Sequence, residues 1–213
     1  NLARLSAAAL LLIFAAACSN NQMTFSKAIS MGQYTAAEEM MEQGYDIDRR
    51  GQDGLTPLQD AIIRGDRKGA RLLVIWGANV NANDGPQNYT PLHFAVLAGD
   101  HLLAKVLMNA GADPNLPDSN KETPIFLAIR AGDQPMVDQL IAGGARVNIE
   151  GPLGQSPLHI AVRYNHTDCI RLLLARGANV NPRDDANVTP YGIALMMNYE
   201  DTARMLDDMG GME

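Results

Sequence analysis

Short apolar segments with helical spacing recur along most of the chain, and a Ser-Pro or Thr-Pro pair precedes five of them. In the clearest copy, Ser156 and Pro157 come before Leu158 and Ala161, which share one side of a helix. Serine is a favourable N-cap, and proline is tolerated at the first helical position because the amide hydrogen it lacks has no partner there. The pattern predicts a short helix that begins at Pro157.

A second apolar segment, from Cys169 to Leu174, follows a polar run and predicts a second helix. Gly177 comes directly after it, and glycine is the residue that ends helices most easily because it has no Cβ. The unit is therefore a turn, two short helices and a return loop.

This unit occurs five times in one phase. Successive copies are 34, 33, 33 and 33 residues apart, and they start at Thr56, Thr90, Thr123, Ser156 and Thr189. The glycines that close the helix pairs keep the same phase, at Gly77, Gly111, Gly144 and Gly177. Repeats of this length bury a continuous core between neighbours, so the pattern predicts one elongated array.

The sequences Thr-Pro-Leu-His at 90–93 and Ser-Pro-Leu-His-Ile-Ala at 156–161, with their 33-residue period, resemble the ankyrin repeat. The resemblance implies an all-α solenoid of helix-turn-helix repeats with hairpin-like finger loops. Residues 25–32 and 34–44 fit the phase of a sixth repeat, an N-terminal cap in which Met23 replaces the turn threonine. Residues 189–209 play the same role at the other end. We therefore expect six repeats within residues 23–213.

The first 17 residues differ from the rest of the chain. One charge, Arg4, precedes an apolar run from Ala7 to Ala17. The run is too short to span a bilayer, which needs roughly 20 apolar residues, but it suits a secretion signal. We interpret residues 1–17 as a signal peptide.

The signal ends in Ala15-Ala16-Ala17-Cys18, which resembles the bacterial lipobox. The resemblance implies cleavage before Cys18, lipidation of its thiol and a short tether over residues 18–22. Ser19 resembles the residue that directs such lipoproteins to the outer membrane, so we expect a periplasmic protein anchored there. The alternative is an ordinary cleavable signal in which Cys18 is incidental.

Composition narrows the classes of partner. Lys and Arg number 17 against 24 acidic residues, a net charge of −7, which argues against binding to a nucleic acid backbone. Cys169 is the only other cysteine, so acylation of Cys18 excludes an intramolecular disulfide. In an apolar helical segment, Cys169 acts as a small hydrophobic residue.

No group of residues predicts catalysis. Of the four histidines, His93 and His159 hold the fourth position of the repeat signature, where the resemblance implies a structural role. His101 and His166 fall between helices without partners at metal-ligand spacing. Neither a nucleophile-base grouping nor a phosphate-binding glycine loop is present in the sequence. We expect a protein that is not an enzyme and has no metal or cofactor.

The ankyrin resemblance implies that the fingers and a concave groove bind another protein. The residues that vary at those positions include arginine and tyrosine, which are frequent at binding hot spots, and adaptable methionine. Leu97 and Met196 stand at such positions too. For Phe94, packing between first helices is the alternative. The predicted partner-binding residues are Leu55, Arg64, Tyr89, Phe94, Arg130, Leu153, Arg163, Tyr164 and Met197.

The sequence thus predicts a membrane-tethered periplasmic protein-binding module that is monomeric when unbound. Bacterial ankyrin lipoproteins resemble immunity proteins that inhibit antibacterial effectors, and this is the more specific hypothesis. The alternative is an envelope scaffold, or a protein that supports oxidative defence beside a catalase. The sequence does not choose between these partners.

Overall fold

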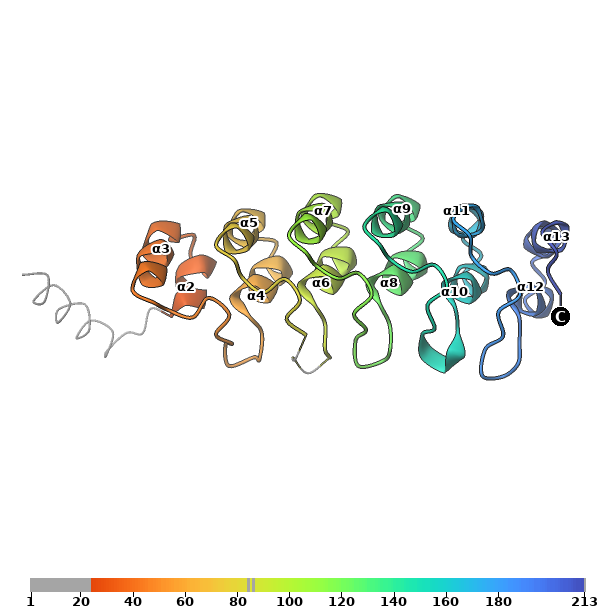
Figure 1. Cartoon of the computed structure of the whole chain (residues 1–213), viewed down its shortest axis with the longest axis horizontal. Helices are drawn as coiled ribbons and strands as arrows, with labels where there is room; N and C mark the ends of the chain where they lie inside the picture. Colours follow the sequence, from red (N-terminus) through yellow and green to blue (C-terminus); the bar gives the residue numbers. More distant parts are fainter. Residues whose placement is uncertain (1–23, 84, 86, 213) are drawn as a thin grey trace, which may run out of the picture.

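The structure is a computed structural model that describes residues 24–83, 85 and 87–212. Helices stack in two parallel rows, with a row of loops projecting beyond one of them (Figure 1). The predicted signal, the tether with Cys18, Met23 and Glu213 lie outside the described residues.

Each repeat contributes one helix to each row. The first helices are α2 (Phe25–Ser30), α4 (Pro57–Ile63), α6 (Pro91–Leu97), α8 (Pro124–Arg130), α10 (Pro157–Arg163) and α12 (Pro190–Met196). The second helices are α3 (Tyr34–Glu42), α5 (Arg67–Ile75), α7 (His101–Asn109), α9 (Gln134–Ala142), α11 (Thr167–Ala175) and α13 (Glu200–Asp208). A short 3-10 turn, η1 (Pro152–Gly154), lies in one finger. No strand occurs in the described part of the chain, so the prediction of an all-α solenoid with six repeats is confirmed.

The first helices begin where the Ser/Thr-Pro pairs predicted. In α6, the His93 amide donates to Thr90 Oγ1 at 3.3 Å, and the Thr90 amide donates to His93 Nδ1 at 3.1 Å. This reciprocal exchange satisfies two amides that the helix itself leaves unpaired. Ser156 with His159 and Thr56 with Gln59 form the same capping box.

The fourth residue of the signature also joins each repeat to the next. His93 Nε2 donates to the Glu122 carbonyl at 3.1 Å, and His159 Nε2 donates to the Val188 carbonyl at 3.0 Å. Gln59 replaces histidine in its repeat, and its Nε2 donates to the Tyr89 carbonyl at 2.7 Å. These contacts agree with the structural role expected for His93 and His159.

A ladder of asparagines ties the return loops together, and sequence analysis gave these residues no role. Asn81 Oδ1 accepts from the Asp113 amide at 2.8 Å, and its Nδ2 donates to the Gly111 carbonyl at 3.0 Å. The same pair of bonds recurs at Asn115, Asn148 and Asn181. Asp48 takes this place in the first repeat and accepts from the Asn79 amide at 2.9 Å.

The cap of the first helix lies one residue beyond the position that aligns with the caps of the other repeats. Met23 occupies the aligned position, and Thr24 caps α2 by accepting from the Lys27 amide at 3.2 Å. The helix begins at Phe25, where the sequence predicted it. The fully buried Phe25 ring, stacked on Tyr45 with centroids 5.5 Å apart, begins the core here.

The core is the continuous interior between neighbouring repeats. Its largest fully buried side chains include equivalent residues of successive first helices, Leu58, Leu92, Ile125 and Leu158. Cys169 is fully buried as well, and burial raises the pKa of its thiol to about 11. It therefore packs as a small apolar side chain, as the sequence predicted.

Substitutions between Asp and Asn in the ladder should change stability in opposite directions in the first repeat and in an inner repeat. Asp48→Asn adds an amide hydrogen that can reach the Gly77 carbonyl, so we expect the free energy of unfolding to rise by about 1 kcal/mol. Asn148→Asp removes the donor to the Gly177 carbonyl and lowers it by about 1–2 kcal/mol. Urea denaturation measures both. Asn120→Asp, at an exposed finger position, is the control. Equal changes in the free energy of unfolding for all three variants would contradict a stabilising role of the ladder hydrogen bonds.

Candidate protein-binding surface

The C-terminal ends of the first helices present an exposed row, which we call the helix-end stripe. It consists of the last residue of each first helix and the residue after it, and all twelve are exposed: 30–31, 63–64, 97–98, 130–131, 163–164 and 196–197. The residue before each pair is buried in the first five repeats, for example Ile129 at 0% exposure. Because neighbouring first helices pack side by side, these ends follow one another along the array.

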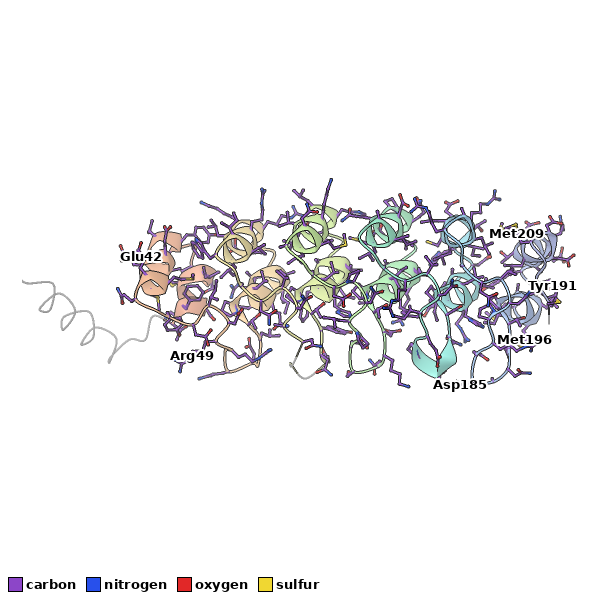
Figure 2. The ribbon with its side chains drawn as sticks, in the orientation of Figure 1. Glu42, Arg49, Asp185, Tyr191, Met196 and Met209 are labelled. Carbon is purple, nitrogen blue, oxygen red and sulfur yellow. The ribbon has the colours of Figure 1, made fainter. Side chains whose placement is uncertain are left out.

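The stripe is unusually apolar for an exposed surface. Among the described residues it holds six of the twelve large hydrophobic side chains that are exposed: Met31, Ile63, Leu97, Tyr164, Met196 and Met197. Figure 2 places Met196 on the row of first helices, whereas Met209 lies on the other row. Exposed apolar side chains gathered in one row mark an interaction site more often than scattered side chains do.

One finger adds an exposed leucine in a strained conformation. Leu153 is 71% exposed, and its φ of 54° lies in the left-handed region that costs a branched side chain about 1–3 kcal/mol. Its carbonyl accepts from the Asp185 amide of the next finger at 3.0 Å. Fingers of other repeats carry Asp53, Gln87, Asn120 and Ala186 at the same place. The prediction of Leu153 as a contact residue therefore rests on an exposed side chain that the fold does not require.

The three predicted arginines are exposed but differ in their electrostatic surroundings. Arg64 pairs with Asp60 on its own helix. Arg130 pairs with Glu122, whose side chain is 8% exposed, so its charge is neutralised by the fold. Arg163 forms no ion pair with any described residue. Only its charge is left for a partner.

Tyr164 is held in place beside Arg163. Its ring stacks on His166 with centroids 6.0 Å apart and planes inclined by 7°. The His166 ring lies against Gly132, where an added Cβ would come within 2.8 Å of it, and its Nε2 is 3.3 Å from the Arg130 carbonyl. The tyrosine is therefore 47% exposed yet ordered, which lowers the entropy lost on binding.

Three of the nine predicted partner-binding residues are half-buried and pack within the fold. The Tyr89 ring stacks on His93 and meets Phe94 edge-on, both with centroids 5.4 Å apart. For Phe94, the structure agrees with the packing alternative. Leu55 is half-buried at the base of its finger. The exposed members are Arg64, Arg130, Leu153, Arg163, Tyr164 and Met197.

Two of the six large apolar stripe residues, Met31 and Ile63, were missed by the sequence analysis. Met31 lies in the repeat that lacks the Thr-Pro signature. Ile63 follows Ile62 in an apolar helical segment, so the sequence does not distinguish it from a core residue. The position of Ile63 relative to its cap could have identified it, because the residue seven positions after each cap threonine or serine is exposed.

The two buried histidines, which are the residues most suited to acid–base or metal chemistry, have structural roles in this fold. Burial lowers the pKa of His93 to about 4 and also lowers the pKa of His159. Both ring nitrogens of each histidine contact other groups. Over residues 24–212, apart from 84 and 86, no three His, Cys, Asp or Glu side chains are placed to hold a metal ion. The described helices include none long and apolar enough to cross a membrane.

Of two surface depressions, one borders the stripe at Ala98 and the other lies away from it. One is lined by residues of the second and third repeats, including Ile62, Arg67 and Asp100. The other lies between α11 and α13 and is lined by Arg171, Arg204 and neighbouring residues. The stripe is thus an open face suited to a macromolecule rather than an enclosed pocket for a small ligand.

Comparison with protein families agrees with this geometry. A family model described as ankyrin repeats in three copies matches residues 77–151 and 125–211, and a single ankyrin repeat matches residues 53–85. The chain belongs to the ankyrin repeat family. Ankyrin repeats generally mediate protein–protein interaction and are typically scaffolds without catalytic activity.

A solved structure extends the similarity to most of the chain. The crystal structure of an ankyrin repeat domain from Acinetobacter baumannii AYE matches with a TM-score of 0.83 at 26% sequence identity. The match covers 90% of this chain and 100% of that one. A search of curated proteins found no match.

His93, one of two buried histidines of this ankyrin array, makes stability depend on pH. His93 has a pKa of about 4 in the folded chain, against an ordinary value near 6.5, so the unfolded chain takes up the proton first as the pH falls. His93 therefore destabilises the fold progressively between about pH 6.5 and 4, by as much as about 3 kcal/mol at the lower end.

We expect His93→Gln to remove this part of the loss, because Gln59 already makes the equivalent bonds in the preceding repeat. Urea denaturation of both proteins at several pH values measures the difference. Stability curves that stay parallel from pH 7 to 4 would show that His93 is not the titrating group.

Proposed function

We propose that this ankyrin protein binds another protein through the helix-end stripe, with Leu153 as a contact from the fingers. The observation that carries the proposal is the alignment of six large exposed apolar side chains at two adjacent positions of the repeat. The core of the first five repeats is supplied instead by the buried residue before each pair.

The composition of the stripe fits a protein partner. Apolar and aromatic side chains supply most of the binding energy at interfaces, and an ordered tyrosine such as Tyr164 loses little entropy. An arginine among them favours one orientation of the partner and speeds its association. Since the net charge is −7, a positive group within the stripe also selects where an acidic partner docks.

For location, the proposal is a periplasmic lipoprotein held at the outer membrane through Cys18. It is supported by the signal-like residues 1–17 and by the small residues that precede the cysteine. With a tether over residues 18–22, the first repeat would lie close to the membrane.

For the specific role, we propose an immunity protein that inhibits an antibacterial effector reaching the periplasm. The combination of a tether and a wide binding face supports it, because an inhibitor must stay where the toxin acts and cover its active site. An envelope scaffold or a partner of oxidative defence shares the tether but has no need of one tight partner.

Substitution within the stripe tests the binding function. We expect Leu97→Ser with Met196→Ser to reduce capture of the partner at least about tenfold, because both lose apolar contact area. The measurement is affinity capture by the full chain from envelope extracts and from lysates of competing bacteria, quantified by mass spectrometry.

Ile75→Ser with Met209→Ser is the matched control, since these side chains are equally exposed but belong to the second helices. An equal loss of partner capture in both double variants would show that the helix-end stripe is not the binding surface. One stoichiometric toxin among the captured proteins supports the immunity role, and several abundant envelope proteins or a catalase support the alternatives.

A cysteine substitution tests the location. We expect Cys18→Ser to move the protein from the detergent-extracted membrane fraction to the soluble periplasmic fraction, because two acyl chains anchor a protein stably and a serine carries none. Cell fractionation with immunoblotting is the measurement. A wild-type chain that is already soluble would favour the ordinary cleavable signal.

A further inference from the structure

Building on the proposed function, we infer the chemistry of the segment that the stripe recognises. The geometry points to an extended peptide segment of the partner in which one carboxylate binds Arg163. An apolar side chain lies about three residues to one side of that carboxylate, and another lies about six residues to the other side.

The carboxylate is assigned from the charges along the stripe. Of its three arginines, Arg64 and Arg130 are already paired with Asp60 and Glu122. The remaining stripe residues, where they are not large and apolar, are Ser30, Ala98 and Ala131. Arg163 is therefore the one guanidinium in the stripe without an ion pair among the described residues.

A buried guanidinium needs a partner, because covering it with apolar groups removes its water and leaves its donors unsatisfied. Any segment that covers the stripe must therefore bring an acceptor to Arg163. A carboxylate satisfies the planar fork with two parallel hydrogen bonds and cancels its charge, which a neutral acceptor does not.

The spacing follows from the packing of the first helices. α6, α8, α10 and α12 lie side by side in that order, and packed helices are about 8–10 Å apart. An extended chain rises about 3.3 Å per residue, so each repeat corresponds to about three residues of a segment running along the stripe. The approach requires no change in the array, since every stripe residue is already exposed.

The apolar positions follow from the same register. Met196 ends α12, one repeat beyond Arg163, and Met197 follows it directly. Leu97 ends α6, two repeats before Arg163. Arg130 lies between Leu97 and Arg163 and is already neutralised by Glu122, so a neutral polar residue fits there. Basic segments are disfavoured because they would face Arg163.

Peptide selection on the full chain tests the inference. The probe is a phage library of random dodecapeptides, selected against wild type, Arg163→Glu and the control Arg171→Glu, which changes an exposed arginine of α11. We expect peptides from wild type to carry an acidic residue with apolar residues about three and six positions away on opposite sides. Arg171→Glu should select the same peptides.

Arg163→Glu should select a basic residue at that position instead, and Arg163→Gln should weaken the wild-type peptides at least about tenfold. Because Arg163 is exposed and unpaired among the described residues, both variants should keep the wild-type urea midpoint. Peptides without an acidic preference, or identical peptides on wild type and Arg163→Glu, would overturn the inference.

Failure of the inference and failure of the proposed function give different results. One outcome is that the selected peptides contain no acidic residue and bind the wild type but not the Leu97→Ser, Met196→Ser double variant. This result would show that the stripe binds protein segments and that the assigned carboxylate is wrong. If no selected peptide depends on the stripe, the inference is overturned, and capture of the whole partner then decides the proposed function by itself.

Discussion

The structure depends on one constraint: the return loop of each repeat has polar backbone groups that side chains of the preceding repeat must satisfy. Asn81 shows how this is done, because its side chain accepts from the Asp113 amide and donates to the Gly111 carbonyl. His93 makes the same kind of connection at the start of the helix, by donating to the Glu122 carbonyl. Neighbouring repeats are therefore joined by hydrogen bonds at fixed positions and by a shared apolar core.

These connections leave other positions free to vary. The last residue of each first helix is exposed, and its identity changes from Ser30 to Ile63 to Arg130 within the same fold. This chain places a large apolar side chain there in three of the six repeats, and adds Leu153 in a finger at a conformational cost. A stack already stabilised by repeated bonds can carry such exposed and strained residues, and they are where binding specificity can develop.

The charges of the stripe are also partly used by the fold and partly left exposed. The chain is acidic overall, yet its stripe holds arginines in three of the six repeats. The fold uses two of them internally and holds Tyr164 next to the third through His166 and Gly132. The outcome is one stripe cation without an ion pair among the described residues, beside a stacked aromatic ring. Met196 and Met197 lie one repeat beyond it, and Leu97 lies two repeats before it. This arrangement favours one position and orientation of a bound segment.

The sequence by itself determined the helices, their order and the number of repeats, because caps, prolines, glycines and apolar spacing act within a few residues. It also identified Arg163, Tyr164 and Leu153 as candidates. Only the tertiary structure decided that Arg130 is neutralised and Arg163 is not. Arg130 and Glu122 are eight residues apart, and nothing in the repeat pattern says that they meet. The asparagine ladder was hidden for the same reason, since its bonds join residues about thirty positions apart that become neighbours only when repeats stack.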